Sequence, residues 1–303
     1  MAQAKIKNEL LLMIKSLRDA VPLFRKNDPL RMGGATAFFT TFALPPIIFI
    51  LVQLFGLFIS RQEVGQRLFL SISNIVGEEG AQQVREVIRS IRGFSSTWYE
   101  IVLGFIFLLF VATTLFNVIK NSLNQLWQIR VDERPGILFF LRIRARSIAV
   151  IILAGILFFA DLLFESLGIL AGNYIDDFWQ GGGIYFKSGI SRIASVLIVA
   201  IWFLLLFRYL ADAMPSWKAA FIGGLLTSVL FTAGRLLLRI ILINSNVGKL
   251  YGASGSLVLL LLFVFYSSFI LYYGACFIAA YSNRKEWPIR PTKKAHHYNI
   301  EKV

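Results

Sequence analysis

The sequence predicts an all-α, polytopic membrane protein with six transmembrane helices and additional amphipathic helices at the membrane interface. The chain of 303 residues is 57% hydrophobic and 16% charged, whereas soluble domains are about 45–50% apolar and about 25% charged. Apolar runs of about 20 residues, the length that a helix needs to cross the hydrocarbon core, recur along most of the chain. Two such runs, 219–243 and 256–280, are joined by a short loop and predict a membrane hairpin.

The chain is predicted to form a single transmembrane domain, residues 33–281, between two basic segments, residues 1–32 and the tail 282–303. The predicted spans are 33–59, 101–119, 148–172, 193–210, 219–243 and 256–280. The first apolar run follows a polar segment and is too long for the core of a signal peptide. No cleavable signal peptide is therefore expected.

Residues 1–32 are predicted to form an amphipathic helix that ends at Asp28-Pro29. Its apolar residues recur at helical spacing: Leu10, Met13, Ile14, Leu17 and Val21. Lysines and arginines lie beside this face. The pattern is typical of a helix that lies on an anionic membrane surface or packs beneath a bundle.

The first span holds Pro45 and Pro46 near its middle. Adjacent prolines remove two backbone donors, so we expect a kink or an unwound turn at this position. Such a break either exposes carbonyls to a transported ion or is a passive packing feature. In both cases nearby hydroxyls are expected to bond the freed carbonyls: Thr36, Thr40 and Thr41.

Residues 61–98 have mixed charge and predict two short amphipathic helices at the outer interface. The second span then continues into a polar stripe. Asn117, Asn121 and Asn124 are four and three residues apart, and therefore share one helix face.

The third span carries Asp161 and Glu165, and the fifth carries Arg235 and Arg239. A glycine-rich loop is expected before the fourth span. The fifth span also has small residues four apart, which permit close helix packing. These pairs are Ala219/Gly223, Ala220/Gly224 and Gly224/Ser228.

The net charge of +14 reflects clusters of lysine and arginine in alternate loops. The amino terminus, the 120–146 loop, the 208–218 turn and the tail hold most of these cations and fall on one side of a six-span layout. The positive-inside rule therefore predicts that both termini are cytoplasmic.

The four charged residues of spans three and five are predicted to neutralise one another. With a rise of 1.5 Å per residue, Asp161, Glu165 and Arg235 lie about 20–27 Å along their helices, and Arg239 lies about one turn further. Two alternatives follow from this. The cluster is either a buried ion-pair network that fixes helix register or the lining of a polar cavity that binds or gates a charged species.

No enzyme constellation is apparent in the sequence. Histidine occurs only as His296 and His297, and no nucleophile elbow, phosphate-binding loop or dinucleotide fingerprint is present. Asp132-Glu133 is a lone acidic pair among arginines. We therefore expect no catalytic activity, cofactor or metal, and no nucleic-acid partner, because a membrane surface accounts for the same basic charge.

Three stretches resemble the YihY/BrkB family of bacterial inner-membrane proteins. They are GGATAFFTTFALPP at 33–46, FNVIKNSLNQLW at 116–127 and YGASGS at 251–256. The polar positions in the last two stretches are Asn117, Asn121, Asn124, Tyr251, Gly252, Ser254, Gly255 and Ser256. The resemblance implies six helices with cytoplasmic termini and an inner-membrane location. It implies no defined reaction, and the older label of ribonuclease BN lacks matching nuclease residues here.

The leading hypothesis is a transporter-like bundle that moves a small solute, an ion or a lipid-derived molecule. The outer charge cluster, the first-span break and the Gly/Ser start of the last span would form the pathway. The alternative is a non-transporting protein that binds membrane lipids or assists envelope assembly, and a ribonuclease ranks third. A water-accessible cavity that reaches Glu165 and Arg235 favours transport, whereas a lateral groove between helices favours lipid handling.

Overall fold

The computed structural model describes residues 2–56, 60, 62–70, 73, 81–82, 85–86, 89, 98–131, 141, 144–157, 159–160, 164, 182–243, 251, 254–292 and 295–298. The helices are α1 (Ala2–Lys26), α2 (Pro29–Phe55), α4 (Trp98–Leu126), α6 (Gly182–Tyr209), α7 (Trp217–Ile243) and α9 (Gly255–Arg284). The strands are β1 (Ile129–Val131), β2 (Ala213–Met214), β3 (Arg290–Pro291) and β4 (Ala295–His297). Residues 144–157 are also helical.

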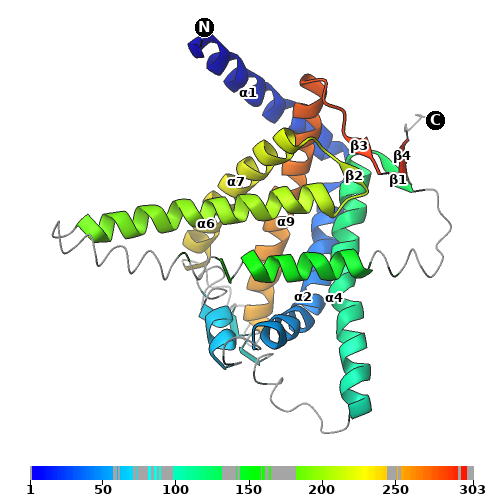
Figure 1. Cartoon of the computed structure of the whole chain (residues 1–303), viewed down its shortest axis with the longest axis vertical. Helices are drawn as coiled ribbons and strands as arrows, with labels where there is room; N and C mark the ends of the chain where they lie inside the picture. The colour runs from blue at the N-terminus through cyan, green and yellow to red at the C-terminus, as the bar shows by residue number, and fades with distance from the viewer. Residues whose placement is uncertain are drawn as a thin grey trace.

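The predicted helical membrane architecture is confirmed at this coarse level. Within the described residues, three helical stretches are long and apolar enough to cross a membrane: Pro29–Gln53, Trp217–Leu238 and Leu257–Arg284. Ile193–Tyr209 is a shorter apolar helix. In Figure 1, α2, α4 and α9 run along the long axis, and α6 crosses them. The six-span layout stays a prediction.

Two helices, α6 and α2, begin before the predicted starts of their spans at residues 193 and 33. α6 begins at Gly182, inside the segment expected to be a glycine-rich loop. No proline interrupts 182–209, and apolar residues continue upstream of Ile193, so the helix extends toward its amino end. α2 begins at Pro29, immediately after Asp28, whose φ of 60° separates it from α1. The predicted end of the first helix at Asp28-Pro29 is therefore confirmed.

At Pro45 and Pro46, of the two alternatives, an unwound turn is excluded, because α2 is helical through both prolines; a kink there stays a prediction. The two prolines free the carbonyls of residues 41 and 42, one turn upstream. The threonine hydroxyls do not bond these groups. Thr40 donates to the Thr36 carbonyl at 2.7 Å, and Thr41 donates to the Ala37 carbonyl at 3.1 Å. The hydroxyls thus bond carbonyls that are already part of the helix.

Helix α1 packs along α9. The Phe24 ring contacts the Phe269 ring edge-on at 5.5 Å between centroids, and the Tyr273 hydroxyl donates to the Leu17 carbonyl at 2.9 Å. Of the two arrangements predicted for the amino-terminal helix, it therefore adopts the one that packs against the bundle. The predicted apolar face is only partly covered, since Leu10 and Ile14 are exposed. Most of 61–98, where two interfacial helices were predicted, lies outside the described residues.

Small residues allow α7 to pack closely on both α6 and α9, as predicted. A Cβ added at Gly224 would lie 2.8 Å from the Ala200 carbonyl oxygen of α6, and one at Gly223 would clash with Ile278 of α9. The Ser228 hydroxyl donates to the Val196 carbonyl of α6 at 2.6 Å. The fifth predicted span is therefore held between the fourth and the sixth.

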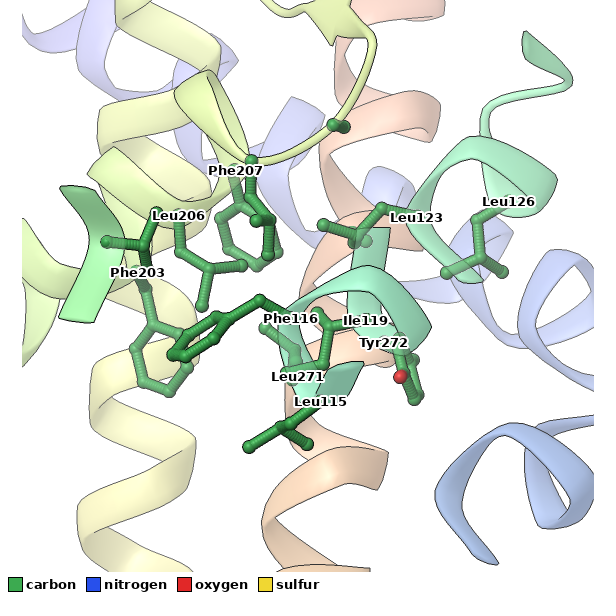
Figure 2. Close-up of a cluster of buried hydrophobic side chains, with 14 of the residues drawn as sticks. Leu115, Phe116, Ile119, Leu123, Leu126, Phe203, Leu206, Phe207, Leu271 and Tyr272 are labelled. Atoms are coloured by element: carbon green, nitrogen blue, oxygen red, sulfur yellow. The ribbon is translucent and has the colours of Figure 1, made fainter. Parts of the chain in front are cut away.

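The hydrophobic core lies where α4, α6 and α9 meet. Figure 2 shows its side chains gathered from these three helices. The members labelled there are Leu115, Phe116, Ile119, Leu123, Leu126, Phe203, Leu206, Phe207, Leu271 and Tyr272. Trp127 completes the core at the end of α4 by donating its indole N–H to the Ala275 carbonyl at 3.0 Å.

Two antiparallel strand pairs, which were not predicted, tie the tail to the loops. Strand β1 pairs with β4, with Ile129 opposite His297, and β2 pairs with β3, with Ala213 opposite Pro291. Figure 1 shows these strands together near the upper end of α4. The 127–131 loop, the α6–α7 turn and the tail therefore lie at one end of the bundle, which we call the loop end.

Candidate functional site

A cavity of about 550 Å³ lies between the helices that form the core. Its walls come from α2, α4, the 144–157 helix, α6, α7 and α9. The lining residues are Thr36, Thr40, Leu115, Phe116, Ile119, Ala154, Leu157, Ser195, Ile198, Val199, Trp202, Phe203, Leu206, Phe231, Arg235, Phe263, Val264, Ser267, Ser268 and Leu271. Several of the core side chains in Figure 2 thus form part of the cavity wall.

Among the described residues, the lining is mainly apolar and contains one charged side chain, that of Arg235, which is partly buried. Five hydroxyl side chains also line the cavity. Those of Ser267 and Ser268 each donate to a carbonyl of their own helix at 2.7 Å. Since these donors are already used, these two hydroxyls can offer only their oxygen lone pairs, as acceptors. The described lining therefore combines an apolar surface with one cation.

The position of Arg235 on α7 indicates how far the cavity extends from the loop end. It follows Trp217 by 18 positions on α7, and with a rise of 1.5 Å per residue this is about 27 Å from the loop end. Thr36, another lining residue, follows the start of α2 at Pro29 by about 10 Å. The cavity thus extends along much of the helix length.

The predicted partners of Arg235 fall outside the described residues. Asp161 and Glu165 lie there, as does the Arg239 side chain. Among the residues that the structure describes, none forms an ion pair with Arg235. The predicted four-residue charge cluster stays a prediction. The cavity reaches Arg235, but the predicted water-accessible cavity that reaches both Glu165 and Arg235 also stays a prediction, because Glu165 lies outside the described residues.

The other predicted site residues do not gather in this cavity. None of the three asparagines lines it, although Asn124 is buried and Asn121 is exposed. Tyr251 is exposed, and Ser254 precedes α9 without a side-chain cap. Gly255 is buried at the helix start. Gly252 and the Ser256 side chain lie outside the described residues.

A second polar site at the loop end was not predicted. The Asp212 carboxylate binds the Lys120 ammonium and the Arg146 guanidinium, each at 2.8 Å. Asn124 donates its amide to the same carboxylate at 3.0 Å and accepts the Asp212 backbone N–H at 2.9 Å. Asp212, Lys120 and Asn124 are all buried. We call these four residues the Asp212 cluster.

Two opposing effects act on the pKa of Asp212. Burial alone raises the pKa of this carboxyl, because the charged form loses water. Hydrogen bonds from Lys120 and Asn124, together with the charges of Lys120 and Arg146, outweigh burial and leave the pKa below its ordinary value. The carboxylate is therefore ionised at neutral pH and compensates the buried Lys120.

A sequence signal for the Asp212 cluster does exist. Lys120 and Asn124 are four residues apart in the polar stripe at the end of the second span, so they share one helix face. Asp212 is the acid in a short turn between two predicted spans. The sequence does not predict the packing that brings the α6–α7 turn against α4.

Comparisons with known proteins agree with the membrane architecture. The sequence profile of the family described as "Virulence factor BrkB" matches residues 22–298. A UPF0761 membrane protein of Pseudomonas paraeruginosa is 24% identical over 265 residues, which cover 86% of this chain and 61% of that protein. One from Saccharophagus degradans is 25% identical, covering 84% of this chain and 56% of the relative.

A third relative, a UPF0761 membrane protein of Legionella pneumophila, is 22% identical, with 92% of this chain and 64% of the relative covered. The chain thus spans less than two thirds of the length of these curated relatives. No solved structure matches it.

Proposed function

The chain belongs to the virulence factor BrkB family of membrane proteins, and from its internal cavity we propose that it is a transporter for amphipathic anions. The substrate class is a small organic anion or a lipid-derived molecule with one charged group and one apolar portion. The proposed location is the bacterial inner membrane with both termini cytoplasmic, because the cation-rich loops and the tail gather at one end.

The observation that carries this proposal is Arg235 in a largely apolar cavity. A cation within a membrane helix costs about 2.5–3.5 kcal/mol on insertion scales, and such residues commonly mark substrate pathways. An anionic ligand group compensates this charge, while the aromatic and aliphatic lining buries the remainder of the ligand. The volume of about 550 Å³ lies in the range of ligand pockets.

The cavity favours transport over a passive packing defect because of its extent and polarity. Purely structural voids in a packed core are small, whereas this one is lined by six helical segments and runs along the helices. The proposed pathway does not use a break at Pro45 and Pro46, since α2 is continuous there.

The test measures flux in proteoliposomes that contain the full-length chain. The probe is decanesulfonate, a permanent anion with one apolar chain, and decyltrimethylammonium is the matched cation. We expect protein-dependent efflux of the sulfonate that exceeds efflux of the ammonium probe. Arg235→Gln should abolish this preference, whereas Arg25→Gln, an exposed cation on α1, should leave it intact.

The same preparation separates the alternatives. Saturable binding of decanesulfonate without flux would support the non-transporting, lipid-binding alternative. Absence of both binding and flux would refute the proposed anion cavity. A third arm incubates the protein with RNA, where we expect no cleavage, since we propose no enzymatic activity.

A further inference from the structure

A second and larger cavity, of about 1090 Å³, opens at the loop end. It is bounded by the α6–α7 turn, the start of α7, β3 and the residues that precede it. The lining residues that matter here are Arg146, Arg208, Asp212, Trp217, Glu286 and Arg290. It is separate in lining from the Arg235 cavity.

The charges in this loop-end cavity favour an anion. Among the described residues, Arg146, Arg208 and Arg290 line it, together with the acids Asp212 and Glu286. Asp212 is already bound to Lys120 and Arg146, so its negative charge is compensated from within the protein. Two guanidinium groups and one carboxylate remain in the described lining, whose net charge is therefore positive.

Arg208 is held in a fixed orientation at the cavity wall. Its guanidinium carbon lies 4.5 Å from the centre of the Trp217 ring, and one of its amino groups donates to the Pro215 carbonyl. A stacked guanidinium keeps several N–H donors in one plane, an arrangement that suits bidentate binding of phosphate oxygens.

An exposed aromatic surface continues from this wall along α7. Trp217 is 52% exposed, and Phe221, one turn further, is 49% exposed. Tyr209 is also exposed and contacts the Trp217 ring edge-on at 6.2 Å between centroids. Tryptophan and tyrosine concentrate at the membrane–water interface, because their rings are amphipathic. The cavity therefore lies beside exposed amphipathic aromatic side chains at the helix ends.

We infer that the loop-end cavity binds the phosphate headgroup of an anionic phospholipid, with an acyl chain along Trp217 and Phe221. Basic pockets at helix ends bind anionic lipid headgroups by this combination of charge and position. The continuous aromatic surface argues for a lipid over free phosphate, which would use the arginines alone. The inference goes beyond the proposed transport and does not depend on it, because it concerns a different cavity.

The experiment measures lipid binding to the full-length chain in a neutral detergent. The probes are palmitoyl-oleoyl phosphatidylglycerol, the phosphatidylcholine with the same chains, and inorganic phosphate. We expect saturable binding of phosphatidylglycerol that weakens as salt is added, and little binding of phosphatidylcholine. Inorganic phosphate at the same concentration should not displace the lipid.

Arg208→Gln should lower the phosphatidylglycerol affinity about fivefold, since one basic residue near a lipid surface contributes about 1 kcal/mol. Arg208→Lys, which keeps the charge but loses the stacked, bidentate geometry, should recover only part of the affinity. Arg130→Gln is the matched control, because Arg130 is exposed at the same end but does not line the cavity. Thermal melting of each variant verifies folding.

Three results would overturn the inference. Equal binding of the two phospholipids would show that the site does not distinguish the charge of the headgroup. Full competition by inorganic phosphate would identify a free-phosphate site. An equal loss in Arg208→Gln and Arg130→Gln would indicate a diffuse electrostatic effect with no defined site. None of these outcomes bears on flux through the Arg235 cavity, so the two proposals fail independently.

Discussion

The Lys120 ammonium lies 2.8 Å from the Asp212 carboxylate and joins the end of α4 to the turn between α6 and α7. Both side chains are nearly inaccessible, at 6% and 10% exposure. The Asp212 backbone carbonyl also accepts the Thr292 N–H at 3.0 Å, which attaches the tail to the same point. One aspartate therefore links a helix end, an interhelical turn and the carboxy-terminal segment.

Asp212→Asn should strongly destabilise the protein. The substitution leaves Lys120 buried without its counter-charge, and removal of one member of a buried pair costs about 3–5 kcal/mol. The measurement is the free energy of unfolding in mixed micelles by denaturant titration. Asp19→Asn is the matched control, because Asp19 pairs with Arg284 at a partly exposed site and should cost less than about 1 kcal/mol.

The double variant Lys120→Met with Asp212→Asn tests the cause of this loss. Because the buried cation is absent, the double variant should be more stable than Asp212→Asn alone. Equal destabilisation of the two variants would indicate that Asp212 acts through the turn conformation and not through charge compensation.

Stability should depend on the ionisation of Asp212 only in acid. Its pKa is lower in the folded protein than in the unfolded chain. Its contribution to the free energy of unfolding is therefore complete above the unfolded pKa of about 3.9, and it is lost as the pH falls through the folded pKa. Melting temperature between pH 7 and pH 5 should therefore not change through this group. The acid loss should be smaller in Asp212→Asn, and a loss centred near neutral pH would contradict this assignment.

The helices were predictable because their signal is local. The lengths of α2, α7 and α9 follow from the lengths of their apolar runs. The small residues of α7 predict that a neighbouring helix approaches closely. The extension of α6 to Gly182 was missed because glycine is a weak helix former. A helix without proline can nevertheless continue through glycines, so a composition of this kind does not define a loop.

The sites were less predictable because they depend on long-range contacts. Arg235 was identified because a charge in an apolar run is costly wherever it points. The Asp212 cluster was missed, since Lys120 and Asp212 are 92 positions apart and each lies at the edge of a span, where a charge needs no partner. Strands β1 and β4 escaped prediction because each is short and is stabilised only by the other.

Gly224→Ala should weaken packing between α6 and α7. An added Cβ would lie 2.8 Å from the Ala200 carbonyl oxygen and 3.0 Å from the Leu204 backbone nitrogen. Since both atoms belong to the backbone, the helices must separate, at a cost of about 1–3 kcal/mol. The unfolding free energy in micelles measures this cost.

Gly34→Ala provides the matched comparison for that prediction, because no atom lies within 4 Å of the added Cβ. It should be neutral or slightly stabilising, since alanine has the higher helix propensity. If both substitutions had the same effect, helix propensity and not interhelical contact would control stability at Gly224.

Ala154→Phe should block the Arg235 cavity without removing its charge. Ala154 lines this cavity from the 144–157 helix, and a phenyl ring at this position occupies space that the proposed ligand requires. We expect decanesulfonate flux in proteoliposomes to fall at least tenfold, because displacement of a bound apolar chain removes several buried methylene groups at about 0.8 kcal/mol each. Leu197→Phe is the control, since Leu197 is an exposed α6 residue outside the cavity.

The two variants of this cavity should affect flux differently. Arg235→Gln should remove the preference for anions, whereas Ala154→Phe should reduce flux of every probe. Unchanged flux in a folded Ala154→Phe protein would exclude this cavity as the pathway.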